Sequence, residues 1–269
     1  MFAYFTDRDG KFQLASLAES GFDPLARTCR FMLTEEAHHM FVGESGVARA
    51  IQRTCEVMRD HKVNDPAQVR ALGVIDLETI QKFINFHYSA TLDLYGSEVS
   101  SNAATYYTTG LKGRASETKL TDDHKLASAE YTVHEVSGGR IVPKPVPALT
   151  ALNARLRDDY IREIQAGLDR WNRIPAQLGV PFRFALPHVG FNRRIGAFAG
   201  HHITPDGQVL SEADWKSHQQ DWLPSLDDHA FIESLMGRVV EPGKFANWIA
   251  PPVRGVNNQP VEFEYVRFN

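Results

Sequence analysis

The feature that most constrains the fold is one long amphipathic helix predicted from Asp23 to about His61. Asp23 is a suitable N-cap because its carboxylate can accept amide protons of the first turn, and Pro24 suits the first helical position, which needs no N–H. Apolar or small side chains recur at helical spacing along the stretch. We therefore expect one face of this helix to pack against other helices.

Two Glu-x-x-His pairs overlap within this helix, and only one of them can face inward. Glu35 and His38 lie on a face that soon becomes polar, whereas Glu36 and His39 interrupt the apolar stripe. A carboxylate and an imidazole in such a stripe are costly to bury unless they are paired or bound to metal. Two interpretations follow: a metal site, or a core histidine bonded to its own glutamate. The stripe comprises Cys29, Met32, Leu33, Glu36, His39, Met40, Gly43, Val47, Ala50 and Ile51.

A shorter helix is predicted from about Phe5 to Ser20, with Asp7 on its inward face. Gly10 favours the alternative of a turn at residues 7–10, because glycine weakens a helix. If the helix forms, Asp7 and Glu36 lie roughly 21 and 18 Å from the bend between the two helices, at 1.5 Å per residue. A carboxylate opposite a Glu-x-x-His is half of the ligand set of a ferritin-like di-iron bundle. The predicted outer face carries Asp9, Gln13, Ser16 and Ser20.

The rest of the chain contributes further helices and a little β-structure. We predict mainly α structure, with helices of a ferritin-like di-iron bundle in residues 1–100. Residues 101–269 form a C-terminal α+β extension with a hairpin, a long helix and loops that pack on the bundle. The predicted elements are a linker with one helical turn at 62–73, a helix at 77–95 capped by Asp76, a loop at 96–126, a hairpin of 130–136 and 140–146, a long helix within 147–178, short helices at 211–220 and 227–236, and a strand at 261–268.

Three other features have both a structural and a functional interpretation. Gly43 and Gly46 indicate close approach of a neighbouring helix, which we favour over a gap for oxygen or substrate. His87 has no carboxylate one turn away and is interpreted as a core histidine. Basic residues of the 96–126 loop are interpreted as a solvated face, with phosphate contacts as the alternative: Lys112, Arg114 and Lys119.

Composition excludes several classes of function. A formal net charge of −4 gives no general reason to expect nucleic acid or an anionic membrane as partner. The sequence has no apolar run of membrane-spanning length and no signal peptide, and its two cysteines fit a reducing compartment, so we predict a cytoplasmic protein. His134 and Glu135 do not form the H-E-x-x-H motif of a zinc-binding helix. The adjacent His201 and His202 are not expected to bind one metal ion together. The sequence contains neither a P-loop motif nor G-x-G-x-x-G.

Three segments resemble the family of benzoyl-CoA 2,3-epoxidase oxygenase components, which is related to phenylacetyl-CoA epoxidase. They are FTDRDGKFQL from Phe5, LTEEAHHMFVGESG from Leu33, and WIAPPVRGVNN from Trp248. The resemblance implies a class I di-iron monooxygenase with two Fe ions on a ferritin-like bundle. It implies Asp7, Glu36 and His39 as metal ligands, whereas an earlier Glu and an earlier Glu-x-x-His of the family pattern are absent and are expected upstream.

The resemblance also implies a reaction. One oxygen atom of O2 enters the aromatic ring of benzoyl-CoA to give the 2,3-epoxide, in aerobic benzoate degradation. Electrons come from a separate flavin and iron–sulfur reductase that uses NADPH. Other ferritin-like di-iron acyl-CoA oxygenases and a non-catalytic helical partner-binding domain remain alternatives, and no catalytic residue is assigned. Contacts to the CoA phosphates are expected from Lys112, Arg114, Arg193 and Arg194.

Overall fold

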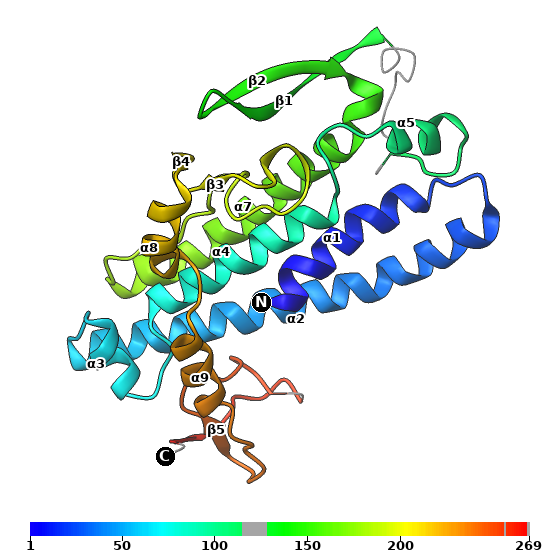
Figure 1. Cartoon of the computed structure of the whole chain (residues 1–269). Coiled ribbons are helices and arrows are strands. Elements are labelled where there is room, and N and C mark those ends of the chain that lie inside the picture. Colours follow the sequence, from blue (N-terminus) through cyan, green and yellow to red (C-terminus); the bar gives the residue numbers. More distant parts are fainter. Residues whose placement is uncertain (115–127, 256, 268–269) are drawn as a thin grey trace.

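The computed structural model describes residues 1–114, 128–255 and 257–267, and this part of the chain is mainly helical with small two-stranded sheets (Figure 1). The prediction of mainly α structure is confirmed, while the ferritin-like topology stays a prediction. The α-helices are α1 (Phe2–Leu17), α2 (Asp23–His61), α3 (Pro66–Ala71), α4 (Leu77–Leu94), α5 (Ser101–Thr108), α7 (Leu152–Leu178), α8 (Glu212–Trp222) and α9 (Leu226–Leu235).

Helices α1 and α2 form an antiparallel pair joined by a short turn, and they lie side by side in Figure 1. The predicted start of α2 is confirmed, but the predicted cap is wrong. Phe22 occupies the N-cap position and makes no side-chain cap. Asp23 is the first residue of the helix, and its exposed carboxylate pairs with Arg27 one turn later, at 2.6 Å.

The helix predicted from about Phe5 to Ser20 is confirmed as α1, and the alternative of a turn at residues 7–10 is wrong. Gly10 fits within α1 because the Glu36 carboxylate of α2 lies over it; a Cβ there would be 3.1 Å from Glu36 Oε1. Gly43 lets α1 approach closely, since its Cβ would be 2.6 Å from the backbone nitrogen of Tyr4. Gly46 differs, because open space surrounds the position of its missing Cβ. Close helix approach is therefore confirmed at Gly43 alone.

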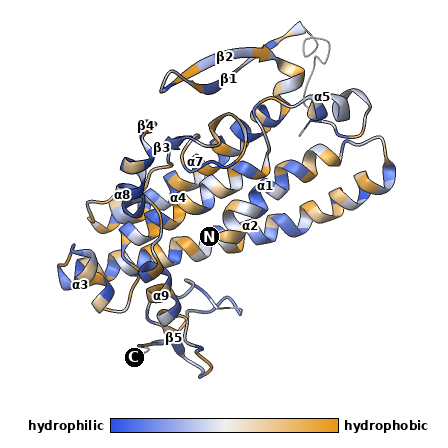
Figure 2. Cartoon of the chain, viewed as in Figure 1, coloured by the Kyte–Doolittle hydropathy of each residue, from blue (hydrophilic) through white to orange (hydrophobic). Residues whose placement is uncertain are grey.

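Helix α1 lies at the centre of the bundle and contacts α2, α4 and α7. Most of the polar face predicted to point outward is consequently buried: Asp9 is 6% exposed, Ser16 and Ser20 are buried, and Gln13 is half-buried. The prediction failed because helical periodicity does not show how many neighbours surround a helix. The main hydrophobic core joins side chains from α1, α2, α4 and α7, and Figure 2 shows the mixed hydropathy along each helix.

The largest exposed apolar side chains of α2 lie off the predicted stripe. Cys29, on the predicted inward stripe, packs against Leu14 and Ala18 of α1 and is buried. Phe31 and Phe41 are 82% and 70% exposed. The uncovered surface of α2 therefore includes Phe31 and Phe41 beside the stripe and also Met32 on the stripe itself, which is 45% exposed.

The segment between α4 and α7 holds a helix that the sequence analysis missed. Helix α5 begins after Ser100, whose hydroxyl accepts a hydrogen bond from the Ala103 amide at 3.1 Å. This cap was hidden within a Ser- and Thr-rich segment that had been interpreted as loop. Residues 115–126 of that predicted loop, including Lys119, lie outside the described residues.

The predicted hairpin is confirmed as β1 (Glu130–Ser137) and β2 (Arg140–Pro147), with Gly138 and Gly139 in the two-residue turn. Both glycines have positive φ, as the turn requires. The predicted helices near 211–220 and 227–236 are α8 and α9, capped by Ser211 and Ser225. The predicted strand at 261–268 shortens to β6 (Glu264–Val266), which pairs in parallel with β5 (Lys244–Ala246). The third small sheet pairs β3 (His202–Ile203) with β4 (Val209–Leu210).

The remaining short elements are 3-10 turns, η2 (Ala148–Ala151) before α7 and η3 (Gly196–Phe198). Asp76 caps α4 as predicted, by accepting the Thr79 amide. Both cysteines are free and buried. No helix within the described ranges combines the length and apolar character needed to cross a membrane.

Candidate metal centre

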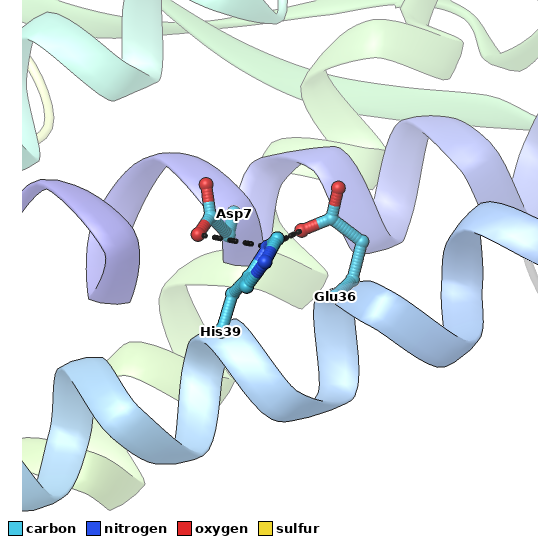
Figure 3. A group of neighbouring side chains, drawn as sticks. All are labelled: Asp7, Glu36 and His39. Carbon is cyan, nitrogen blue, oxygen red and sulfur yellow. Dashed lines mark ion pairs between the residues drawn. The ribbon is translucent and has the colours of Figure 1, made fainter.

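The α1–α2 pair brings together the three side chains that the sequence pattern selected. Asp7 projects from α1, and Glu36 and His39 project from α2 toward it (Figure 3). One potential ligand atom from each residue lies within 4.8 Å of the other two. The His39 Nδ1 atom is 3.6 Å from Asp7 Oδ2 and 4.0 Å from Glu36 Oε2. Asp7 therefore lies opposite Glu36 and His39, as predicted from their similar distances to the bend between the two helices.

The two carboxylates are more enclosed than the imidazole. The side chains of Asp7 and Glu36 are 20% and 16% exposed, whereas that of His39 is 50% exposed. Burial raises the pKa of Asp7, and the nearby His39 partly offsets the effect. Burial also raises the pKa of Glu36, and the Asp7 charge raises it further. A bound cation would stabilise the ionised form of these two neighbouring carboxylates.

One oxygen of this group lacks a hydrogen bond. Glu36 Oε2 is buried and has no hydrogen-bond partner among the described residues. Its 4.0 Å separation from His39 is too long for a hydrogen bond. A buried carboxylate oxygen without a donor is costly, so this atom is suited to a cation.

The second Glu-x-x-His pair lies on a different face of α2. Glu35 and His38 are exposed and belong to no group of metal-ligating side chains in the described ranges. His38 and His39 are adjacent in sequence, yet their ring centroids are 6.3 Å apart. The geometry agrees with the choice of Glu36 and His39, although their role as ligands stays a prediction.

A network of ion pairs next to this group holds α1, α2 and α7 together, and the sequence analysis did not identify it. Arg8 of α1 contacts Glu44 of α2 at 3.3 Å and Glu163 of α7 at 3.2 Å. Arg170 of α7 also pairs with Glu44, at 2.5 Å. Its hydrogen bond lowers the pKa of Glu44 against the opposing effect of burial. Glu44 follows Glu36 by eight residues, and this helical spacing could have predicted that Glu44 lies near the same face of α2.

The remaining histidines singled out earlier do not approach the group. His87 lies among the rings of Phe5, Phe83 and Phe86. Burial lowers its pKa to about 4, so it is neutral near pH 7. His202 stacks on Trp215 at 5.4 Å between ring centroids. These positions agree with the interpretation of His87 as an interior residue.

The four basic residues expected at phosphates separate into different environments. Arg193 is fully buried and pairs with Asp93 at 2.5 Å and with Glu98 at 3.5 Å, so its role is structural and the expectation is wrong for this residue. The backbone amide of Arg194 also bonds to Asp93, at 2.9 Å, while its side chain remains exposed. Lys112 and Arg114 line a cavity of about 200 Å³ between α5 and α7. Their predicted contact with phosphate stays a prediction.

A carboxylate on one helix facing a Glu-x-x-His on its antiparallel neighbour has the arrangement of half of the ligand set in carboxylate-bridged metal sites of helical bundles. No protein-family model matches the chain. The chain is, however, 67% identical over 269 residues to benzoyl-CoA oxygenase component B of Aromatoleum evansii. The alignment covers all of this chain and 57% of that relative. The resemblance found in the sequence is thus confirmed, and the chain spans little more than half the length of the relative.

Proposed function

We propose that this chain provides one side of the di-iron centre of an oxygenase that acts on benzoyl-CoA. The observation that carries the proposal is the convergence of Asp7, Glu36 and His39 within a chain so similar to a benzoyl-CoA oxygenase component. The proposed fold is a ferritin-like bundle in which α1 and α2 are two of the ligand-bearing helices. The remaining ligands, a Glu and a second Glu-x-x-His, would belong to sequence outside these 269 residues.

The side chains fit iron in their chemistry and placement. Carboxylate and imidazole groups are common ligands of non-haem iron. Asp7, Glu36 and His39 come from facing helices, and the buried Glu36 Oε2 has no competing hydrogen bond among the described residues. Iron bound here would supply the reaction with O2, which places one oxygen atom on the ring and releases the other as water.

The protein groups have a different task from the iron. Asp7, Glu36 and His39 would hold the metal between two helices, and the closely packed pair fixes their separation. The ion pairs of Glu44 with Arg8 and Arg170 fasten these helices to each other and to α7. We assign the supply of electrons to a separate reductase that uses NADPH, which is what the resemblance to a component of a benzoyl-CoA oxygenase implies.

The test is the reaction itself, with protein produced from the complete gene. Purified protein is analysed for iron and incubated with benzoyl-CoA, ¹⁸O₂, NADPH and a reductase preparation. We expect a product that carries one labelled oxygen atom and retains the CoA thioester. Mass spectrometry of the product, with an anaerobic sample as control, measures this result.

Other outcomes identify the rival functions. Oxygen insertion into phenylacetyl-CoA but not into benzoyl-CoA would assign a different acyl-CoA oxygenase. Protein that contains no iron after reconstitution, and that turns over neither thioester, would contradict the proposal. It would support the alternative that Glu36 and His39 merely pair in a helical partner-binding domain.

A further inference from the structure

Glu44 of α2 is the point at which three helices are joined next to the candidate metal centre. It follows His39 by five residues, which is about 7.5 Å along the helix axis at 1.5 Å per residue. Its carboxylate accepts two hydrogen bonds from Arg170 of α7, at 2.5 and 2.8 Å, and pairs with Arg8 of α1 at 3.3 Å. Its backbone carbonyl oxygen accepts a hydrogen bond from Trp171 Nε1 at 3.1 Å. Glu44 therefore connects α2 to both neighbouring helices.

Arg8 carries this connection to the candidate ligands, because it directly follows Asp7 in α1. The Arg8 side chain is only 10% exposed and lies between Glu44 and Glu163, a carboxylate of α7 that also pairs with Lys11. A guanidinium group that is removed from water needs carboxylate partners. Without the Glu44 charge, Arg8 would depend on the partly exposed Glu163. We expect the α1 backbone next to Asp7 to shift in response.

Packing and ion pairing contribute differently to the contact of α1 with α2. At Gly43 the α2 backbone approaches the backbone of Tyr4 closely, and this contact limits the separation of the two helices. Apolar contact is non-directional, whereas charge-assisted hydrogen bonds have a defined geometry. Glu44 places such bonds one residue after Gly43. The glycine thus sets the distance between the helices, and the carboxylate adds a preferred position along their axes.

The Glu44 carboxylate is ionised near neutral pH. The hydrogen bond from Arg170 lowers the pKa of Glu44, and this effect outweighs that of burial. The Glu44 side chain is 23% exposed, so its ion pairs are less screened by water and salt than pairs at the surface.

We propose that Glu44 is a positioning residue for the metal centre, which fixes the register of α1 on α2 and thereby holds Asp7 opposite the candidate ligands of α2. The presence of a metal in this inference rests on the proposed function, whereas the effect on the two helices does not. Ligands need to be held within about 0.5 Å of their working geometry, so a small shift of α1 would be sufficient to weaken the site.

The first test is independent of metal. Hydrogen–deuterium exchange of metal-free protein from the complete gene is followed by mass spectrometry. In Glu44→Gln we expect the α1 peptides around Asp7 to exchange at least about 5-fold faster than in the parent. Asp228→Asn removes an ion-paired carboxylate that joins other helices, and it should leave these peptides unchanged. Equal exchange in the parent and Glu44→Gln would overturn the proposal, as would the same increase in Asp228→Asn.

The second test measures the metal in protein from the complete gene that has been loaded with Fe²⁺. We expect Glu44→Gln to release iron to a chelator about 10-fold faster, the lower end of the effect of losing a hydrogen-bonded partner of a metal ligand. Its Mössbauer spectrum should also differ from that of the parent. Glu35→Gln removes the same charge from an exposed position of α2 and should match the parent in both measurements.

A second variant keeps the proposal testable if Glu44→Gln does not fold. Arg170→Gln changes a half-exposed side chain and removes two hydrogen bonds to Glu44, so both measurements should shift in the same direction. Release of iron at the parent rate in both variants would contradict the positioning role while leaving the proposed function intact. A parent that takes up no iron would instead refute the proposed function, and faster exchange around Asp7 would then assign Glu44 to the helix pair alone.

Discussion

At the scale of single residues, Gly43 and Gly46 show that one residue type serves two purposes within a single turn of α2. The absence of a side chain at Gly43 admits the backbone of Tyr4, whereas at Gly46 it leaves space in a cavity. Sequence periodicity places both glycines near the stripe of Glu36 and His39, but it contains no information about which one meets a neighbour.

The two glycines should therefore respond in opposite directions to the same substitution. Gly43→Ala should lower the free energy of unfolding by about 1–3 kcal/mol, because the new Cβ overlaps the α1 backbone. Gly46→Ala should raise it by up to about 1 kcal/mol through helix propensity. Urea unfolding followed by circular dichroism measures both values. Equal effects of the two substitutions would show that α1 does not approach α2 at Gly43.

Glu35 and Glu36 provide a matched pair for the candidate metal centre. Glu36→Gln should remove most of the iron, because this carboxylate faces Asp7 and His39. Glu35→Gln should leave the iron content near that of the parent, since its side chain is exposed on another face. Elemental analysis of protein from the complete gene measures the iron. If Glu35→Gln loses as much iron as Glu36→Gln, the wrong pair has been assigned to the metal.

At the scale of elements, α9 is anchored to α3 and α4 through Asp228. This carboxylate accepts hydrogen bonds from the Ser225 amide at 2.9 Å and from Arg70 at 2.5 Å, and Lys82 lies 3.5 Å away. Burial alone would raise the pKa of Asp228, but the bonds from Ser225 and Arg70 and the charge of Lys82 lower it to about 2. The anchor thus depends on an ionised carboxylate.

The lowered pKa of Asp228 gives the stability a definite dependence on pH. A depressed folded-state pKa contributes stability above the ordinary value of 3.8, and that contribution is lost as the pH falls toward 2. We expect Asp228→Asn to be less stable than the parent near neutral pH, with the difference narrowing below about pH 4. Urea midpoints for both proteins across this range provide the measurement. A constant difference would mean that Asp228 is not held ionised by its neighbours.

The elements also show what the sequence could predict. The long helices α2, α4 and α7 were predictable because apolar residues recur at helical spacing over many residues, and α4 also has the predicted cap at Asp76. The hairpin was predictable from Gly138 and Gly139. Helix α5 was missed because its single cap at Ser100 is a weak local signal. Burial of Asp9 was missed because it depends on α4 and α7, which are distant in sequence from α1.

The geometry of the candidate site was more predictable than its surroundings. The spacing of Glu36 and His39 and the depth of Asp7 follow from helical repeat alone. The pairing of Glu44 with Arg170 depends on how α7 crosses the pair, and that crossing is not encoded in local spacing. The cavity beside Gly46 also depends on how the helices cross, so the sequence analysis could give a gap at Gly43 and Gly46 only as the alternative to close helix approach.

At the scale of the whole molecule, the described chain offers three candidate metal ligands and an uncovered helix surface. Asp7, Glu36 and His39 form one group that could hold a metal ion, and within the described ranges no second group of three such residues converges. The exposed Phe31 and Phe41 lie on the same helix. Because the chain spans 57% of its relative, these features agree with a centre completed by further sequence.

If Asp7, Glu36 and His39 are only part of the ligand set, the 269-residue polypeptide and the longer protein should differ in iron content. A polypeptide limited to the 269 residues should hold well under one iron per chain, because two carboxylates and one imidazole leave most coordination positions to water and His39 is half exposed. Protein from the complete gene, if it carries the other Glu and Glu-x-x-His, should hold about two. Elemental analysis after anaerobic loading with Fe²⁺ and gel filtration compares the two proteins, and Glu36→Gln in the longer one controls for adventitious iron. Two tightly held irons in the 269-residue polypeptide would show that its ligands differ from those assigned here.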